Sequence, residues 1–200
     1  MNVNVICAIA ANCSIDIQAY GGHYDLNLAG FVKLNNVTVW RSSVRGPAPN
    51  LRGVNILLIE PLKCSVQESR NFDTYAYRAS TRELSTYLKQ VRSGGVIVGV
   101  TADDPTANLA YALPALHQLG VDVYDVQFRG AFAFVAQQGS PAKTVLRKTW
   151  TDTVADQPRL TVNITGIIQN NLLPDRTNGR SYATVLRPSV RLSVCLSSVT

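Results

Sequence analysis

Val54-Asn55-Ile56-Leu57-Leu58-Ile59 is a nearly uninterrupted run of branched apolar residues, and it decides the fold class. An apolar run of this length without alternation is typical of a strand that is buried on both faces of a sheet. Residues 96–101 and 131–137 have the same character, and residues 121–126 are also assigned to a short strand. These four segments predict strands, with residues 54–59 at the centre of a sheet.

The flanking segments also have the composition of strands. Residues 14–20 and 30–40 are rich in β-branched and aromatic residues and predict short strands that are separated by a turn at Gly21-Gly22. The pattern of residues 160–199 is β again, with Asn178-Gly179 as the expected hairpin turn.

Two segments have the period of a helix instead. The first begins with a capping box, Ser80-Thr81-Arg82-Glu83, and stops at Ser93-Gly94-Gly95. Between these signals runs an apolar stripe at positions i, i+3, i+4 and i+7, formed by Leu84, Tyr87, Leu88 and Val91. The spacing therefore predicts one amphipathic helix.

The second helical segment opens at Asp104-Pro105, with Asp104 as the N-cap and proline at the first helical position. We expect Pro114 to kink this helix and Gly120 to end it. Its apolar stripe is formed by Leu109, Leu113 and Leu116. Since strands outnumber the two helices, the sequence predicts an α+β fold.

The composition is that of a chain with a core. Of its 200 residues 46% are hydrophobic and 16% are charged, which excludes a disordered protein. No run approaches the ~20 apolar residues of a membrane span. The uncharged start lacks the basic region of a signal peptide, so we expect that Met1 does not begin the natural precursor if the protein is secreted, as the cysteines and sequons below favour.

The charge is positive and unevenly spread. The net charge is +6, and residues 143–191 carry eight basic side chains against three acidic ones. Such a region favours anionic partners, among them nucleic acid, acidic glycans and lipid headgroups. Because no Arg/Lys cluster is dense and no nucleic-acid module is recognisable, we expect a solvated basic surface and no nucleic-acid partner.

The cysteines bear on the cellular compartment. Cys7, Cys13, Cys64 and Cys195 form no Cys-x-x-Cys pair, and with two histidines in the chain they do not indicate a metal site. They are either buried free thiols or two disulfides of an oxidising compartment. Three Asn-x-Ser/Thr sequons favour the second alternative, a secreted or lumenal glycoprotein; their asparagines are Asn12, Asn36 and Asn163.

The polar residues form no catalytic pattern. His23 and His117 are far apart in the sequence, and the chain has neither a Gly-x-Ser-x-Gly elbow nor a glycine-rich phosphate loop after a strand. Asp103-Asp104 is a pair of carboxylates, but we assign Asp104 to the helix cap, which leaves one free. We therefore expect no enzymatic activity and no cofactor.

Several segments are similar, in their order and spacing, to the motifs of one family. The segments are residues 51–58, 71–75, 93–98, 101–106 and 127–135. The family is that of the interleukin-like EMT inducer (ILEI), which includes pancreatic-derived factor and the stem domain of protein O-mannose N-acetylglucosaminyltransferase. The resemblance extends from about Cys7 to about Lys148. Two departures are Cys64, which follows a strand that the family's third cysteine precedes, and Gly130, which replaces an acidic residue.

The resemblance implies a fold and a disulfide pattern. It implies a compact, β-sandwich-like globular domain of mixed or antiparallel sheets with two main helices over residues 7–148. Residues 149–200 would be a β-rich extension that packs on the same domain. It also implies a Cys13–Cys195 bridge, since these residues match the family's second and final cysteines. Cys7–Cys64 would then be the second bridge.

The resemblance also implies a sugar-binding site at Arg52, Asp103 and Arg129, which follow or precede predicted strands. In the glycosyltransferase stem domain the matching residues hold a terminal N-acetylglucosamine. An ionised carboxylate beside arginines can bind sugar hydroxyls, and Phe128 or Tyr75 would offer a ring face. We expect Asp103→Ala and Arg129→Ala to abolish binding without unfolding the domain.

Two alternatives remain open from the sequence. The same three residues could form a structural ion pair instead of a glycan site. The chain could also be a secreted, cytokine-like signalling ligand that acts through a protein receptor at the cell surface, since several relatives resemble secreted cytokine-like factors. Our first expectation is a lectin-like module whose partners are glycans or glycoproteins.

Overall fold

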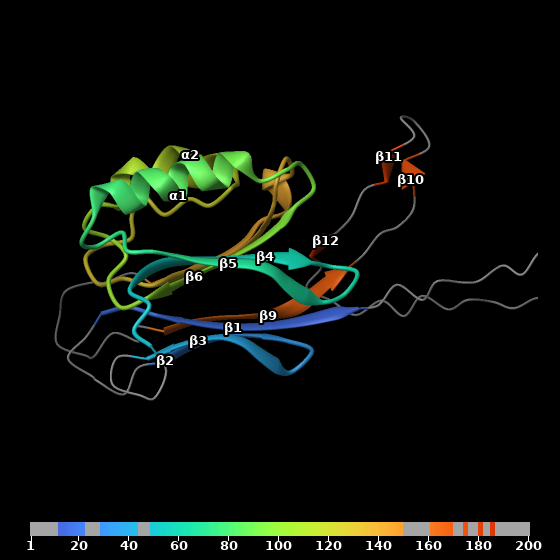
Figure 1. Ribbon diagram of the computed structural model, residues 1–200, viewed down its shortest axis with the longest axis horizontal. Coiled ribbons are helices and arrows are strands. Elements are labelled where there is room, and N and C mark those ends of the chain that lie inside the picture. The colour runs from blue at the N-terminus through green and yellow to red at the C-terminus, as the bar shows by residue number, and fades with distance from the viewer. Residues whose placement is uncertain are drawn as a thin grey trace, which may run out of the picture.

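The structure is a computed structural model that describes residues 12–22, 29–43, 49–149 and 161–169, together with three two-residue strands nearer the C-terminus. The described residues form two five-stranded sheets and two α-helices (Figure 1). Both helices cover one face of the second sheet, and the first sheet lies against its other face (Figure 1). The predicted α+β class, with antiparallel sheets and two helices, is confirmed.

The first sheet has the strand order β12-β9-β1-β2-β3, and its pairs are antiparallel. Along β1 the alternation of residues decides which side faces the core: Ile15 and Ile17 are buried, whereas the intervening Asp16 is partly exposed. The strands are β1 (Cys13–Tyr20), β2 (Ala29–Leu34), β3 (Val37–Ser43), β9 (Thr161–Gln169) and β12 (Val185–Leu186).

The segment 30–40 is a hairpin rather than the single strand expected from its composition. Asn35 and Asn36 have φ values of +48° and +64°, the left-handed conformation of a tight two-residue hairpin turn. The Asn35 side chain accepts a hydrogen bond from the Ser14 backbone N–H at 2.9 Å, which holds the turn against β1. Asparagine tolerates this conformation better than most residues, so the Asn-Asn pair was the available sequence signal.

The second sheet has the order β5-β4-β6-β7-β8, again antiparallel. All residues of β6 and β7 are buried, as their apolar runs predict. Val98 and Val135 face the first sheet, whereas Ile97 and Phe134 lie in the core under the helices. The strands are β4 (Gly53–Glu60), β5 (Ser65–Phe72), β6 (Val96–Ala102), β7 (Phe132–Gln137) and β8 (Val145–Lys148).

Helix α1 (Arg78–Gln90) has the predicted apolar stripe but not the predicted start. Its N-cap is Tyr77, which makes no side-chain capping bond, so the capping box at Ser80 is wrong. The reason lies upstream, where the Asp73 carboxylate accepts hydrogen bonds from the backbone N–H groups of Tyr75 and Ala76. This turn directs the chain into the helix before Ser80 is reached. The predicted end is correct, since α1 stops before Gly94, which has a φ of +85°.

The second predicted helix is shorter than expected. Asp104 accepts hydrogen bonds from the Thr106 N–H and hydroxyl at 2.9 and 2.7 Å, so it closes a turn and does not cap a helix. A 3₁₀ turn, η1 (Leu109–Tyr111), leads into α2 (Leu113–Gln118), in which Pro114 occupies the first turn. No kink results, because a proline in the first turn removes no helical hydrogen bond. Gly120 follows the helix end with a φ of +78°, as predicted.

Residues 121–126 are not a strand, which corrects that prediction. The Asp122 carboxylate accepts a hydrogen bond from the Tyr124 N–H, and the Val126 N–H bonds the Val123 carbonyl, so the segment folds into turns. The segment carries valines because the side chains of Val121 and Val123 are buried in the core beneath the helices. Burial by a turn and burial in a strand give the same pattern over so few residues.

The C-terminal part contributes to the first sheet. Strand β9 pairs with β1 from Thr161 opposite Tyr20 to Ile168 opposite Cys13. Further on, β10 (Pro174–Asp175) pairs antiparallel with β11 (Arg180–Ser181), while the expected turn Asn178-Gly179 lies outside the described residues. The boundaries expected at residues 7, 148 and 149 stay predictions. No helix in the described part of the chain is long and apolar enough to cross a membrane.

Candidate functional site

Arg52 lies immediately before β4 and is fixed by an ion pair. Its Nε and Nη2 atoms donate to the two carboxylate oxygens of Asp73 at 3.2 and 2.8 Å. The guanidinium also lies over the Tyr75 ring, 4.6 Å from its centroid. Such a two-point contact holds the planar guanidinium in one orientation. Arg52 therefore presents its remaining donors in a fixed direction.

The charges of this pair are mutually stabilised. The hydrogen bond from Arg52 to Asp73 raises the pKa of Arg52 above its ordinary value. Burial alone would raise the pKa of Asp73, but hydrogen bonds from Arg52 and from the Ala76 backbone lower it below its usual value. Both groups are consequently charged at neutral pH.

The backbone before β4 is held by amide side chains. The Asn55 Nδ2 donates to the Leu51 carbonyl at 2.8 Å, and Asn71 Nδ2 donates to the carbonyls of Leu51 and Arg52 at 3.1 and 3.0 Å. Asn71 Nδ2 also donates to Asn55 Oδ1 at 2.9 Å. Asn55 is the one polar residue within the apolar run of β4, and this position is explained by its support of Arg52.

Asp103 and Arg129 share an unusual backbone conformation. Asp103 follows β6 with a φ of +55°, and Arg129 precedes β7 with a φ of +63°. The left-handed region is uncommon for residues other than glycine, and strained residues of this kind cluster at functional sites. In each case the conformation changes the direction of a charged side chain at a position next to a strand end.

Gly21 and Gly22 pack against these two residues. A Cβ atom built on Gly21 would lie 2.0 Å from the Arg129 carbonyl oxygen. A Cβ atom on Gly22 would lie 2.7 Å from Asp103 Oδ1 and 3.3 Å from Arg129 Cγ. Only glycine allows this approach. The Gly21-Gly22 pair is thus the contact through which the end of β1 meets the second sheet at Asp103 and Arg129, a role that was not evident from the sequence.

The three predicted site residues come together at one end of the second sheet. Gly53 pairs with Ala102, so Arg52 and Asp103 are the next residues on adjacent strands. The Asp103 carboxylate is close enough to contribute to the raised pKa of Arg52. Asp103 and Arg129 meet around Gly22. The ion pair of Arg52 is formed with Asp73, which the sequence did not single out as its partner.

Aromatic rings flank these charges. Phe128 is 59% exposed, and the Arg129 guanidinium lies 5.0 Å from the centroid of its ring. Tyr75, under Arg52, is also exposed. An exposed ring beside a guanidinium offers an apolar face next to hydrogen-bond donors, which is the combination that a pyranose ring can contact.

Other titratable residues do not join this site. His117 is exposed and packs edge-on against Tyr124, and His23 lies outside the described residues. Asp104 is buried, and its Oδ2 atom has no hydrogen-bond partner among the residues that the structure describes. Within these same residues no group of three or more His, Cys, Asp or Glu side chains could hold a metal ion.

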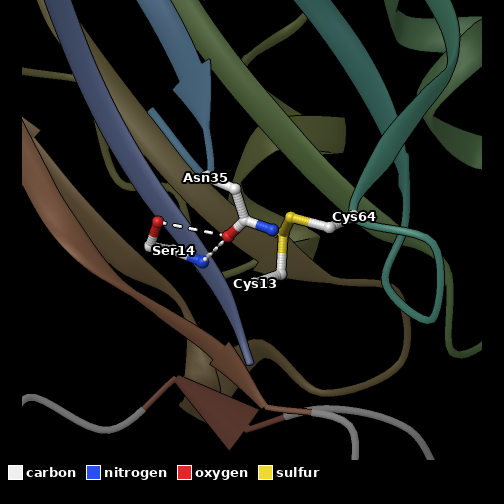
Figure 2. The surroundings of a disulfide bond; sticks show 4 residues. All are labelled: Cys13, Ser14, Asn35 and Cys64. Atoms are coloured by element: carbon white, nitrogen blue, oxygen red, sulfur yellow. Dashed lines mark hydrogen bonds between the residues drawn. A yellow bond between two sulfur atoms is a disulfide. The ribbon is translucent and has the colours of Figure 1, made fainter. Parts of the chain in front are cut away.

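The disulfide differs from both predicted bridges. Cys13 is joined to Cys64, with their Cα atoms 5.2 Å apart (Figure 2). Cys13 begins β1 and faces the core, and Cys64 ends the turn between β4 and β5, so the packing of the two sheets brings them together. The predictions Cys13–Cys195 and Cys7–Cys64 are therefore wrong. Cys7 and Cys195 themselves lie outside the described residues.

The three sequon asparagines are exposed. Asn12 directly precedes β1, Asn36 lies in the turn between β2 and β3, and Asn163 lies within β9. All three are therefore carried by the first sheet or its margins, away from the helices (Figure 1). Their accessibility is compatible with modification, which stays a prediction.

A pocket of about 830 Å³ lies at the opposite end of the second sheet. It is lined by the turn after β4, by the C-terminal end of α1 and by the segment after β7. Tyr87, which is 8% exposed, lies in its wall, and its hydroxyl has no hydrogen-bond partner among the described residues. Burial raises the pKa of Tyr87 to about 12, and the charge of Glu68 adds to the rise. Sequence reasoning assigned Tyr87 to the helix core and did not find this pocket.

Comparison with known proteins adds two findings. Residues 52–140 match the sequence profile of the family described as "Interleukin-like EMT inducer". The chain is also 30% identical over 96 residues to the human (Homo sapiens) "Cell migration-inducing and hyaluronan-binding protein". This match covers 47% of the chain but spans only 7% of the length of the human protein.

Proposed function

Because residues 52–140 match the model of the interleukin-like EMT inducer family, we propose that the chain is a non-catalytic carbohydrate-binding module. It recognises a terminal sugar such as N-acetylglucosamine through Arg52, Asp103 and Arg129. The observation that carries this proposal is the convergence of the three side chains at one end of the second sheet, beside the exposed ring of Phe128.

The chemistry of the site fits a sugar hydroxyl. A hydroxyl is a donor and an acceptor at once, so it can donate to the Asp103 carboxylate while it accepts from an arginine. Hydrogen bonds to charged groups contribute about 1.5–3 kcal/mol each. Arg52 is already oriented by Asp73, so little side-chain entropy is lost when it binds. The name of the human relative, which is hyaluronan-binding, supports a glycan partner.

An extracellular or lumenal location accompanies this function. The Cys13–Cys64 bridge is of the kind that persists in oxidising compartments. The exposed asparagines Asn12, Asn36 and Asn163 then become N-glycosylation acceptors in the secretory pathway. Both features support a secreted glycoprotein.

The test is a titration of the isotope-labelled protein with N-acetylglucosamine glycosides and short hyaluronan oligosaccharides, followed by NMR. Substitutions are chosen to respect the left-handed backbone. Asparagine tolerates it, so Asp103→Asn removes only the charge, and glycine prefers it, so Arg129→Gly removes the guanidinium without adding strain. The alanine substitutions expected from the sequence are less informative, because alanine would be strained at both positions.

We expect each variant to lower the affinity by about tenfold or more while its melting temperature is unchanged or raised. Arg92→Ala, an exposed arginine at the pocket end, is the control and keeps full affinity. Unchanged binding in both site variants contradicts the assignment of the site. A large loss of melting temperature in both would identify a structural ion cluster instead.

The second candidate is a cytokine-like signalling ligand, which the description of the family model favours. A protein receptor would bind a surface rather than the three charged residues alone. Wild-type protein that binds no glycan but crosslinks to one cell-surface protein, equally well with Asp103→Asn, would support this alternative.

A further inference from the structure

A second group of exposed residues adjoins the sugar site. Tyr77 is 63% exposed, Tyr111 is 41% exposed and Tyr75 is 38% exposed. Two arginines of the first turns of α1 lie against Tyr111: Arg78 is 6.0 Å and Arg82 is 5.3 Å from the centroid of its ring. These residues, Tyr75, Tyr77, Arg78, Arg82 and Tyr111, are called the tyrosine–arginine surface below.

The charges of Arg78 and Arg82 do not stabilise the dipole of α1. The buried face of α1 consists of Thr81, Leu84, Tyr87 and Leu88, so Arg78 and Arg82 lie outside the core. Positive charges at the N-terminus of a helix oppose its dipole, and like charges four residues apart repel each other. No acidic residue lies in the first turn, and the charge of Glu83 acts on Arg70 of β5. The positive charge of this surface therefore has no structural explanation in α1.

The surface is continuous with Arg52 through a series of contacts. The Tyr75 ring lies beneath the Arg52 guanidinium, and the Tyr75 carbonyl accepts a hydrogen bond from Asn108 Nδ2 at 2.6 Å. The Asn108 carbonyl in turn accepts a hydrogen bond from the Tyr111 N–H at 3.4 Å. Tyr111 then contacts Arg78 and Arg82. Tyr75, Asn108 and Tyr111 therefore connect Arg52 to the two arginines of α1.

We propose that the tyrosine–arginine surface binds an anionic glycan chain that extends from the terminal-sugar site. This inference rests on the proposed function, since Arg52 is the point of continuity. Carboxylate or sulfate groups of the chain pair with Arg78 and Arg82, and sugar rings lie against the exposed tyrosines. A guanidinium that lies over an aromatic ring keeps its edge free, and that edge presents paired N–H donors with the geometry of a carboxylate or sulfate.

The experiment compares four probes by calorimetry at several salt concentrations: a neutral N-acetylglucosamine oligosaccharide, a hyaluronan oligosaccharide, a heparin oligosaccharide and a single-stranded DNA of similar charge. The hyaluronan and heparin arms distinguish carboxylate from sulfate as the anion. The wild type should bind at least one of the anionic glycans about tenfold or more tightly than the neutral chain, with an advantage that shrinks as salt increases.

The decisive variant is Arg78→Gln/Arg82→Gln, with Lys89→Gln/Arg92→Gln as the control. Both remove two positive charges, but Lys89 and Arg92 lie at the other end of α1. The first variant should lose the tenfold advantage for the anionic glycan and keep its affinity for the neutral chain. Its melting temperature should not fall, because the arginines oppose the helix dipole. The control should change the affinity for each glycan by less than threefold.

Three outcomes overturn the inference. An equal loss of affinity in the control means that net charge, and not this surface, attracts the glycan. Binding of the DNA as tightly as the glycans means that the surface recognises any polyanion. Binding of the neutral chain without an advantage for either anionic glycan removes the extended site but leaves the proposed function intact. The proposed function fails by a different result, when Asp103→Asn and Arg129→Gly leave the binding of the neutral chain unchanged.

Discussion

The two ends of the second sheet differ in volume and in the arrangement of charged side chains, although each has a non-glycine residue in the left-handed conformation, Cys64 at one end and Asp103 and Arg129 at the other. At the end formed by Arg52, Asp103 and Arg129, charged side chains are held by an ion pair, by left-handed backbone and by glycines that approach within contact distance. At the other end lies the pocket of about 830 Å³, bordered by the turn before Cys64 and by Tyr87. Volume and preorganised charge are therefore separated by the length of the sheet.

If the proposed sugar site is correct, cavity size alone is a poor guide to the binding site of this domain. Ligand pockets are commonly the largest concave regions, but a site for one or two sugar hydroxyls needs oriented donors and acceptors more than volume. The strained residues indicate where the fold maintains an unfavourable local conformation. The following substitutions test whether the two ends are as independent as their structures imply.

The largest effect is expected from the disulfide next to the pocket. Replacing Cys13 and Cys64 together by alanine should lower the free energy of unfolding by about 4 kcal/mol, because the bridge joins residues 51 positions apart. Chemical denaturation measures this loss. At a temperature where the variant is folded, its affinity for N-acetylglucosamine should stay within threefold of the wild type. Loss of sugar binding in the folded variant would show that the two ends are coupled.

A smaller effect is expected from Gly21→Ala at the site end. The added Cβ would lie 2.0 Å from the Arg129 carbonyl oxygen, so the backbone must move, at a cost of about 3 kcal/mol. Because Arg129 is displaced, the variant should also lose sugar binding. The matched substitution at the pocket end is Gly94→Ala, which meets nothing within 4 Å but has a φ of +85°. It should cost about 1 kcal/mol and leave binding unchanged. Equal destabilisation by both variants would contradict the close approach at Gly21.

The ion pairs at the two ends of the sheet should contribute differently to the stability of the domain. Asp73→Asn removes the two-point partner of Arg52 and should lower stability by about 1 kcal/mol at neutral pH. Glu68→Gln breaks the exposed Arg70–Glu68 pair at the pocket end, where the N–O distance is 2.5 Å, and should cost less than Asp73→Asn because solvent screens the pair. Thermal unfolding at pH 7 compares the two. A larger loss in Glu68→Gln would reverse the ranking.

The Asp73 pair also predicts a dependence on pH. Because the pKa of Asp73 is lower in the folded state than in the unfolded chain, its contribution is complete above the unfolded value of about 4. The contribution is lost as the pH falls below that value. The stability of Asp73→Asn should therefore decline less steeply between pH 4 and the acid limit than that of the wild type. Parallel declines would mean that the carboxylate is not paired in solution.

The smallest effect is expected from Tyr87→Phe. The hydroxyl has no hydrogen-bond partner among the described residues, so its removal should change stability by less than about 0.5 kcal/mol at pH 7. The pKa of Tyr87 is raised to about 12, so the wild type should lose stability as the pH increases from about 10 to about 12, and the variant should lose less. Absorbance titration of the tyrosines measures the shift. A loss above 1 kcal/mol at pH 7 would reveal a hydrogen bond that the hydroxyl makes.

The sequence predicts the core better than the boundaries. The runs of β4, β6 and β7 are mostly apolar because both faces of these strands are buried, and the stripe of α1 follows directly from its period. The start of α1 was wrong because the Asp73 turn outweighs a capping box, and such competition between local motifs depends on where the chain enters from β5. The prediction of a strand at residues 121–126 was wrong because a buried turn and a buried strand have the same composition.

The site was predictable in part. Arg52, Asp103 and Arg129 stand next to predicted strands, and antiparallel pairing then brings them to one sheet end. Asp73 and the Gly21-Gly22 pair were missed as parts of the site, because their roles depend on contacts between segments distant in sequence. The predicted disulfide pairing was wrong for the same reason. The pairing of Cys13 with Cys64 follows from the packing of one sheet on the other, which four cysteine positions alone do not specify.

The Cys13–Cys64 bridge also determines how the domain would respond to a pulling force. The bridge encloses β1 to β4, that is, three strands of the first sheet and strand β4 of the second. Tension applied to the two ends of the chain passes through the two sulfur atoms and bypasses everything between them. The segment between the two cysteines, which are 51 positions apart, could not be extended, and this shortens the extensible chain by roughly 170 Å. Strand β9, which is paired along β1 outside this covalent loop, would be peeled away while the enclosed strands still carry no load. Reduction of the disulfide would therefore increase the length to which the chain can be extended.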